Sequence, residues 1–193
     1  MMVASDNARQ PRKDAVANRA HILDTAARVF AEEGVNVSMD ALAKHAGIGS
    51  ATLYRNFPNK DALLAALLAP HHERLATRRI AIERSDGDAG QKLQQWIDAL
   101  GDWMLAFEGL PEPLREAWMT DTSALKPACD GLIATTEKFL DAAQRDGFSR
   151  PCLSGRDVFI GVMALAWASE QTTVGRTSRA VLSDMLRNGW AVG

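Results

Sequence analysis

The short segment from Ser50 to Asn56 carries side chains that suit hydrogen bonding to nucleic acid. Its hydroxyl, amide and guanidinium groups can bind phosphate oxygens and base edges, the two kinds of polar partner that DNA offers. Leu53 and Phe57 lie four residues apart, so they would share one face of a helix and anchor it inward. Small side chains at 50–52 would let the start of that helix approach a base edge closely.

Two predicted helices precede this segment and would position it. Residues 14–33 carry an apolar stripe at helical spacing, and Gly34 can end that helix in the left-handed conformation. Ser38 can cap a short second helix through its hydroxyl group. Residues 47–49 read Gly-Ile-Gly, which favours a tight turn, and Pro58 should end the third helix. Two short helices joined by a glycine turn are the local pattern of a helix-turn-helix.

The rest of the chain also predicts helices, and no stretch shows the alternation typical of a strand. A fourth helix should begin near Asn59 and run toward Glu83, and Pro70 should kink or split it. After a turn at residues 85–90, the expected helices are 91–108, 112–121, 128–145, 155–173 and 177–190. Glycine and proline residues, Gly175 among them, separate these segments. The predicted fold class is therefore all-α, with about nine helices.

Composition and charge narrow the function classes. The 193 residues are 47% hydrophobic and 24% charged with a net charge of −2, as in an ordinary globular protein. This balance argues against a protein that coats nucleic acid or membrane with its whole surface. Charge is unevenly placed, however, because residues 9–28 are mainly basic, whereas residues 98–121 are mainly acidic with Arg115 as their one basic group. A local basic face at the N-terminal end remains compatible with DNA binding.

Other chemistry finds little support in the sequence. Cys129 and Cys152 lie far apart, which predicts neither a disulfide framework nor a zinc site. We expect both side chains to be buried in the protein as small apolar groups, which is consistent with a reducing cytosol. The four histidines show no metal-ligand spacing, and no catalytic constellation is evident. We therefore predict that the protein binds no metal and no cofactor and is not an enzyme. No apolar run approaches the roughly 18–20 residues of a membrane span, so we expect a soluble, cytoplasmic protein.

The run from Val37 to Leu63 resembles the DNA-binding signature of the tetracycline-repressor (TetR) family, and residues 19–34 resemble that family's first helix. The close resemblance covers residues 16–68. It implies a flexible basic arm at 1–13, a helix-turn-helix domain at 14–68, and a helical domain for ligand binding and dimerisation at 69–193.

The resemblance also implies which side chains contact DNA. Ser38, Tyr54 and Lys60 would bind phosphate, and Arg55 would reach a guanine or, as the alternative, a phosphate. The full predicted set is Ser38, Lys44, Gly49, Ser50, Ala51, Thr52, Tyr54, Arg55, Asn56 and Lys60. Many family members have histidine in place of Asn56 and serine in place of Gly49, so the operator sequence does not follow from the resemblance.

The resemblance also implies a ligand pocket inside the helical domain. Large apolar side chains in the C-terminal two-thirds are candidates for its lining, with plain core packing as the alternative. These pocket candidates are Trp96, Leu100, Trp103, Met104, Phe107, Trp118, Met119, Met163 and Trp167. Residues 158–168 are apolar almost all round, which suggests burial against a second subunit. The candidate dimer-interface residues are Phe159, Val162, Ala166, Leu182, Met185 and Leu186. Gly161 and Ala164 are small enough for close helix approach.

Together these observations predict a homodimer that binds a palindromic operator on double-stranded DNA. The resemblance to the family implies a repressor that a small, hydrophobic effector releases from DNA. The fourth predicted helix would flex at Pro70. An activator, or a regulator without a ligand, would use the same DNA chemistry. A helical adaptor without DNA function is the alternative from another class.

Overall fold

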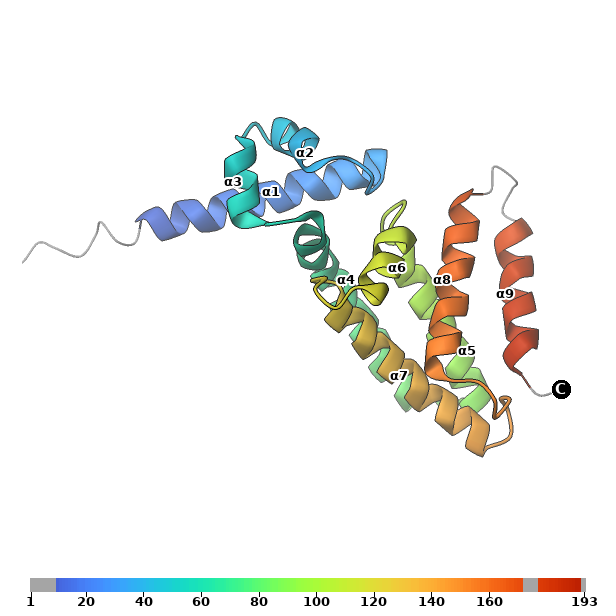
Figure 1. Cartoon of the computed structure of the whole chain (residues 1–193). Helices are drawn as coiled ribbons and strands as arrows, with labels where there is room; N and C mark the ends of the chain where they lie inside the picture. The colour runs from blue at the N-terminus through green and yellow to red at the C-terminus, as the bar shows by residue number, and fades with distance from the viewer. Residues whose placement is uncertain (1–9, 172–176, 192–193) are drawn as a thin grey trace, which may run out of the picture.

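The computed structural model describes residues 10–171 and 177–191, and their regular secondary structure is helical. An isolated bridge between Ser149 and Ala191 is their one β-type pairing. The helices are α1 (Gln10–Glu33), α2 (Met39–His45), α3 (Ser50–Asn56), α4 (Lys60–Arg84), α5 (Ala89–Met104), α6 (Pro111–Met119), α7 (Lys126–Arg145), α8 (Gly155–Gln171) and α9 (Thr177–Trp190) (Figure 1). The predicted all-α fold class is therefore confirmed.

Helices α1–α3 form a small unit at one end of the molecule, called the head below (Figure 1). Gly34 ends α1 with a φ of 75°, and Gly47 adopts a φ of 63° in the turn between α2 and α3. The Ser38 hydroxyl oxygen accepts a hydrogen bond from the backbone N–H of Ala41 at 3.1 Å, which caps α2 as predicted. Gly49 is the N-cap residue of α3. A side-chain cap thus starts α2, whereas no side chain caps the start of α3.

Helix α4 joins the head to the remaining helices, α5–α9, called the body below (Figure 1). It runs without interruption through Pro70, so the predicted split is wrong. Pro70 is exposed, so its ring lies on the solvent side of the helix. Leu67, Leu68 and Leu75 are buried on either side of the proline and hold both halves against the core.

Two helix ends differ from the prediction by four residues each. The α1 backbone is already helical at Gln10, so the last residues of the predicted arm belong to the helix; the arm's first nine residues lie outside the described residues, as does Gly175. Helix α5 ends at Met104 rather than at 108, and Phe107 lies in the following loop, where its ring packs edge-on against Phe30 of the head.

The body packs around α5, α7 and α8. The Trp96 ring stacks on Phe139 with centroids 5.4 Å apart, and its Nε1 donates to the Thr136 hydroxyl oxygen at 2.9 Å. Cys129 is buried as predicted, and burial raises its thiol pKa to about 11. Cys152 is exposed, which contradicts the prediction, because it lies in the loop between α7 and α8 rather than on a packed helix face.

Three of the six candidate interface residues require a correction. Phe159, Val162 and Ala166 are buried within the chain itself, because this face of α8 packs into the body. Their side chains are therefore not available to a second subunit.

Candidate nucleic-acid interface and body cavities

Helix α3 presents polar side chains outward and apolar ones inward. Leu53 and Phe57 are buried in the head, which confirms their predicted role as anchors. The side chains that this leaves outside are Ser50, Ala51, Tyr54 and Arg55, which are exposed, and Thr52 and Asn56, which are half-buried. A short helix with one anchored face and one small, polar face has the shape needed to enter a major groove.

Hydrogen bonds order several of these side chains. Ser50 donates its hydroxyl to Asp40 of α2 at 2.8 Å, which ties the start of α3 to its neighbour. Arg55 lies one turn after Thr52 and donates to its hydroxyl oxygen at 3.0 Å. The Asn56 amide donates to the Thr52 carbonyl oxygen at 2.9 Å. The Arg55 guanidinium is thus held on the exposed face of α3 with further N–H groups left to donate.

Two contacts that the sequence does not predict hold α2 and α3 on α1. The Arg19 guanidinium lies over the Phe57 ring, 4.2 Å from its centroid, and donates to the Asn56 carbonyl oxygen at 3.5 Å. His21 Nε2 lies 3.0 Å from the Ala46 carbonyl oxygen near the end of α2. Both pairs join residues far apart in the sequence, so no local sequence pattern predicts them.

Lys60, like Ser38 above, already has a hydrogen-bond partner within the chain. The Lys60 ammonium donates to the Val35 carbonyl oxygen at 3.0 Å. Desolvation lowers its pKa from the ordinary value, and the charge of Asp61 partly opposes this shift. An ammonium has three N–H donors, so Lys60 can hold Val35 and still reach a phosphate. Lys44 is exposed in the last turn of α2.

A backbone contact docks the head on the loop between α5 and α6. The Val35 N–H donates to the Glu108 carbonyl oxygen at 2.8 Å. On the other side of the same loop, the Gly109 N–H donates to a carboxylate oxygen of Glu170, in the last turn of α8, at 2.9 Å. The loop therefore connects α8 to the turn that precedes α2, through two consecutive residues.

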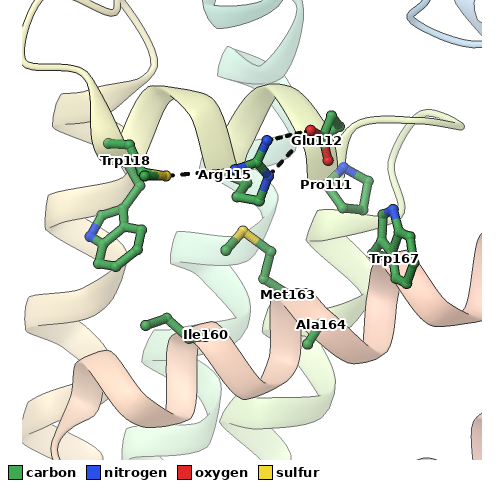
Figure 2. A pocket seen from close by; sticks show the side chains of 9 residues that line it. Pro111, Glu112, Arg115, Trp118, Ile160, Met163, Ala164 and Trp167 are labelled. Atoms are coloured by element: carbon green, nitrogen blue, oxygen red, sulfur yellow. Dashed lines mark hydrogen bonds and ion pairs between the residues drawn. The ribbon is translucent and has the colours of Figure 1, made fainter.

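A groove of about 460 Å³ lies between α6 and α8 (Figure 2). Four of the candidate pocket residues line it: Trp118, Met119, Met163 and Trp167. Pro111, Ile160 and Ala164 add apolar surface, and Arg115 and Glu112 pair with each other on the α6 side (Figure 2). The hydrogen bond from Arg115 holds the pKa of the Glu112 carboxyl below its ordinary value.

The other five pocket candidates are buried: Trp96, Leu100, Trp103 and Met104 in the body core, and Phe107 in the loop that packs against the head. Two of them also border smaller cavities. Trp96 borders one of about 310 Å³, and Trp103 borders one of about 390 Å³ beside α4. The predicted set thus does not form one pocket.

Side chains that could ligate a metal are scattered over the described part of the chain. Within 10–171 and 177–191, no three His, Cys, Asp or Glu side chains gather in a group that could hold a metal ion. None of the helices in these ranges combines the length and the apolar character that a membrane crossing requires.

Similarity to known proteins covers both the head and the body. Residues 22–67 match the family described as "Bacterial regulatory proteins, tetR family". Residues 88–191, more than half of the chain, match the family "Transcriptional regulator SbtR-like, C-terminal domain". An HTH-type transcriptional regulator of Staphylococcus aureus is 53% identical over 53 residues, which cover 27% of this chain and 29% of that protein. The curated relatives therefore match this chain over less than a third of their own length.

Solved structures extend the similarity over most of the chain. A TetR transcriptional regulator of Streptomyces coelicolor is 27% identical, with 90% of this chain and 98% of that chain covered at a TM-score of 0.56. A TetR-family regulator of Pectobacterium atrosepticum shares the fold at a TM-score of 0.64 and 22% identity, over 94% of this chain and 98% of that chain. Helix α3 has the polar outward face that suits a DNA groove, and two family models match the chain. This chain therefore belongs to the TetR family of DNA-binding transcriptional regulators.

Proposed function

We propose that this regulator represses transcription by binding a palindromic operator as a homodimer, and that a small, mainly apolar effector releases it. The observation that carries the proposal is the exposed polar face of α3 on its buried anchors, Leu53 and Phe57. Figure 1 shows α2 and α3 on the side of α1 that lies away from the body, so duplex DNA can approach them. The predicted set of DNA-contacting residues, from Ser38 to Lys60, is retained in this proposal.

The dimer interface that we propose uses the outward faces of α8 and α9. Trp167, Val181 and Met185 are 49%, 52% and 65% exposed, and such large apolar side chains favour a protein partner when they gather on one surface. Ile160 and Ala164 lie on the same face of α8 as Trp167, at helical spacing. These residues replace the buried Phe159, Val162 and Ala166. Leu182 and Leu186 are half-buried and can contribute their edges.

This interface changes the interpretation of the groove between α6 and α8. Ile160, Ala164 and Trp167 line that groove and also belong to the proposed interface. A second copy that packs on α8 would therefore cover part of the groove. The effector is better placed in a cavity away from this face.

DNA binding is tested by selecting duplexes from a random pool with the full chain and measuring affinity for the selected site. Arg55→Ala should weaken binding by about 10–100-fold, because a bidentate base contact contributes about 1–3 kcal/mol of discrimination. Arg84→Ala is the matched control, since Arg84 is an exposed arginine at the far end of α4. Indifference of the wild-type chain to all duplexes at low salt would overturn the proposal.

Repression is tested by placing the selected site in the promoter of a reporter gene. Expression of the wild-type chain should lower the reporter signal, and Arg55→Ala should restore it. A signal that rises with the wild-type chain would show an activator instead.

A further inference from the structure

Asp40 of α2 and Ser50 of α3 form a hydrogen-bonded pair on the surface of the head. The Ser50 hydroxyl donates to the Asp40 carboxylate at 2.8 Å, and both residues are exposed. Lys44 lies one turn after Asp40, so the same side of α2 carries a cation from the proposed DNA-contacting set. The phosphate backbone repels a carboxylate, so Asp40 suits this surface only with a different kind of partner.

Ser38 and Ser50 differ in the direction of their hydrogen bonds. The Ser38 oxygen accepts from the Ala41 N–H at 3.1 Å, which leaves the Ser38 proton to donate to a phosphate oxygen. The Ser50 proton is used by Asp40, so the Ser50 oxygen can only accept a further hydrogen bond. Phosphate oxygens also accept only, and Ser50 in this state therefore cannot bind one. Toward DNA, Asp40 and Ser50 together offer acceptors alone.

The four bases differ in how well their major-groove edges fit two acceptors. Cytosine presents its N4 amino group, which is a donor, and no acceptor. Adenine also presents an amino group, but it places the acceptor N7 beside that group, where a carboxylate would repel it. Guanine and thymine present acceptor oxygens. Cytosine is therefore the base whose edge fits this pair.

We propose that Asp40 and Ser50 read the amino group of a cytosine in each half-site of the operator. The groove-facing N–H of a paired cytosine can be shared between two neighbouring oxygens as a three-centre hydrogen bond. Asp40 thereby becomes a specificity-determining residue that belongs to α2 and not to α3, and that is absent from the DNA-contacting set named above. This inference deepens the proposed reading of a palindromic operator and rests on it.

The first test selects duplexes from a random pool with the full wild-type chain and with two variants. The wild type should select a C·G pair at one position of each half-site. Asp40→Ala should remove this preference and Ser50→Ala should reduce it, at the same position, while the other positions stay unchanged. Removing the carboxylate also reduces repulsion from phosphate, so the readout is the ratio of affinities for duplexes that differ at this one pair. Lys44→Ala is the control, because loss of a phosphate contact should weaken all duplexes alike.

The second test changes the amino group itself by placing N4-methylcytosine at the selected cytosine. In a Watson–Crick pair, the methyl group replaces the N–H that faces the major groove, and the pairing N–H remains. This change should weaken binding by the wild type about tenfold, as expected for loss of a specific base contact. The double variant Asp40→Ala/Ser50→Ala should bind both duplexes about equally. N4-methylcytosine outside the half-sites should leave the affinity of the wild type unchanged.

Circular dichroism and melting curves establish that each variant is folded. If Asp40 only ties α3 to α2, both single variants should weaken every duplex alike and keep the base preferences of the wild type. That result would overturn the inference. Selection of another base at the affected position, or equal effects of N4-methylcytosine on the wild type and the double variant, would overturn it too. Each of these outcomes leaves the proposed function standing, whereas a wild-type chain that binds no duplex would overturn both.

Discussion

Glu170 is a half-buried carboxylate at the end of α8, and its contact with Gly109 links α8 to the loop that docks the head. Burial raises the pKa of this carboxyl above its ordinary value, with a further contribution from Glu108, and the Gly109 N–H partly opposes the shift. A carboxyl whose pKa is higher in the folded than in the unfolded state penalises folding when it is ionised. The penalty disappears as the pH falls through the folded-state pKa.

Glu170→Gln keeps an acceptor for Gly109 but carries no charge. We therefore expect the variant to melt at a higher temperature than the wild type at about pH 7, with the difference shrinking as the pH falls through the raised folded-state pKa and Glu170 becomes protonated. Thermal melts of both chains over this pH range provide the measurement. A difference that grows on acidification would contradict this explanation of the contact.

For individual residues, too, the sequence predicts some contacts of the site and not others. The outward residues of α3 follow from helical spacing once Leu53 and Phe57 are taken as anchors, because that argument needs only neighbours within one turn. The packing of Arg19 on Phe57 joins residues too far apart for this rule. The same limit applies to the Lys60–Val35 hydrogen bond. Such contacts depend on how whole helices cross, which local periodicity does not specify.

The packing of α7 against α8 depends on Gly155, the first residue of α8. A Cβ atom at this position would lie 2.5 Å from the backbone nitrogen of Glu137 and 2.8 Å from its Cα. The Gly155 N–H also donates to the Glu137 side chain, so the two helices meet backbone to backbone here. Unlike the end of a flexible side chain, backbone atoms in the middle of a helix cannot move aside easily.

Gly155→Ala should therefore lower the free energy of unfolding by about 1–3 kcal/mol through overpacking. Gly131→Ala is the matched control, because Gly131 lies in α7 and a Cβ atom there would meet no other atom within 4 Å. Removing this helical glycine should stabilise the chain by about 0.5–1 kcal/mol. Urea unfolding of both variants provides the free energies. Equal stability of the two variants would show that α7 and α8 can separate slightly at no cost.

The sequence predicts best which segments form helices. Apolar periodicity identifies the described helices, and the capping residue Ser38 locates the start of α2. The error at Pro70 has a physical cause: a proline rule considers one helix alone, whereas buried leucines on both sides keep α4 continuous. For α8, apolar residues on every face hide which face packs inward, so the pattern places Phe159 on the wrong surface.

At the scale of the whole molecule, the proposed interface on the exposed apolar faces of α8 and α9 would determine how two copies present two heads to DNA. These helices run side by side on the part of the body that lies away from α3 (Figure 1). A symmetric dimer uses the same patch twice, so each substitution in it counts twice. Two heads on one assembly can occupy successive major grooves, about 34 Å apart, and the second contact then benefits from a high effective concentration.

Met185→Glu should separate the dimer without unfolding the chain, because Met185 is 65% exposed within one copy. Burying two unpaired carboxylates in the interface should weaken association by at least about 3 kcal/mol, or roughly a hundredfold. Sedimentation should then show monomers, and affinity for a palindromic duplex should fall toward that for a single half-site. Ile80→Glu provides the control, because Ile80 is an apolar side chain on α4 that is 40% exposed, outside the proposed interface. If Met185→Glu stayed dimeric while Ile80→Glu dissociated, the interface would lie along α4 instead, and the two α3 helices would face DNA with a different spacing.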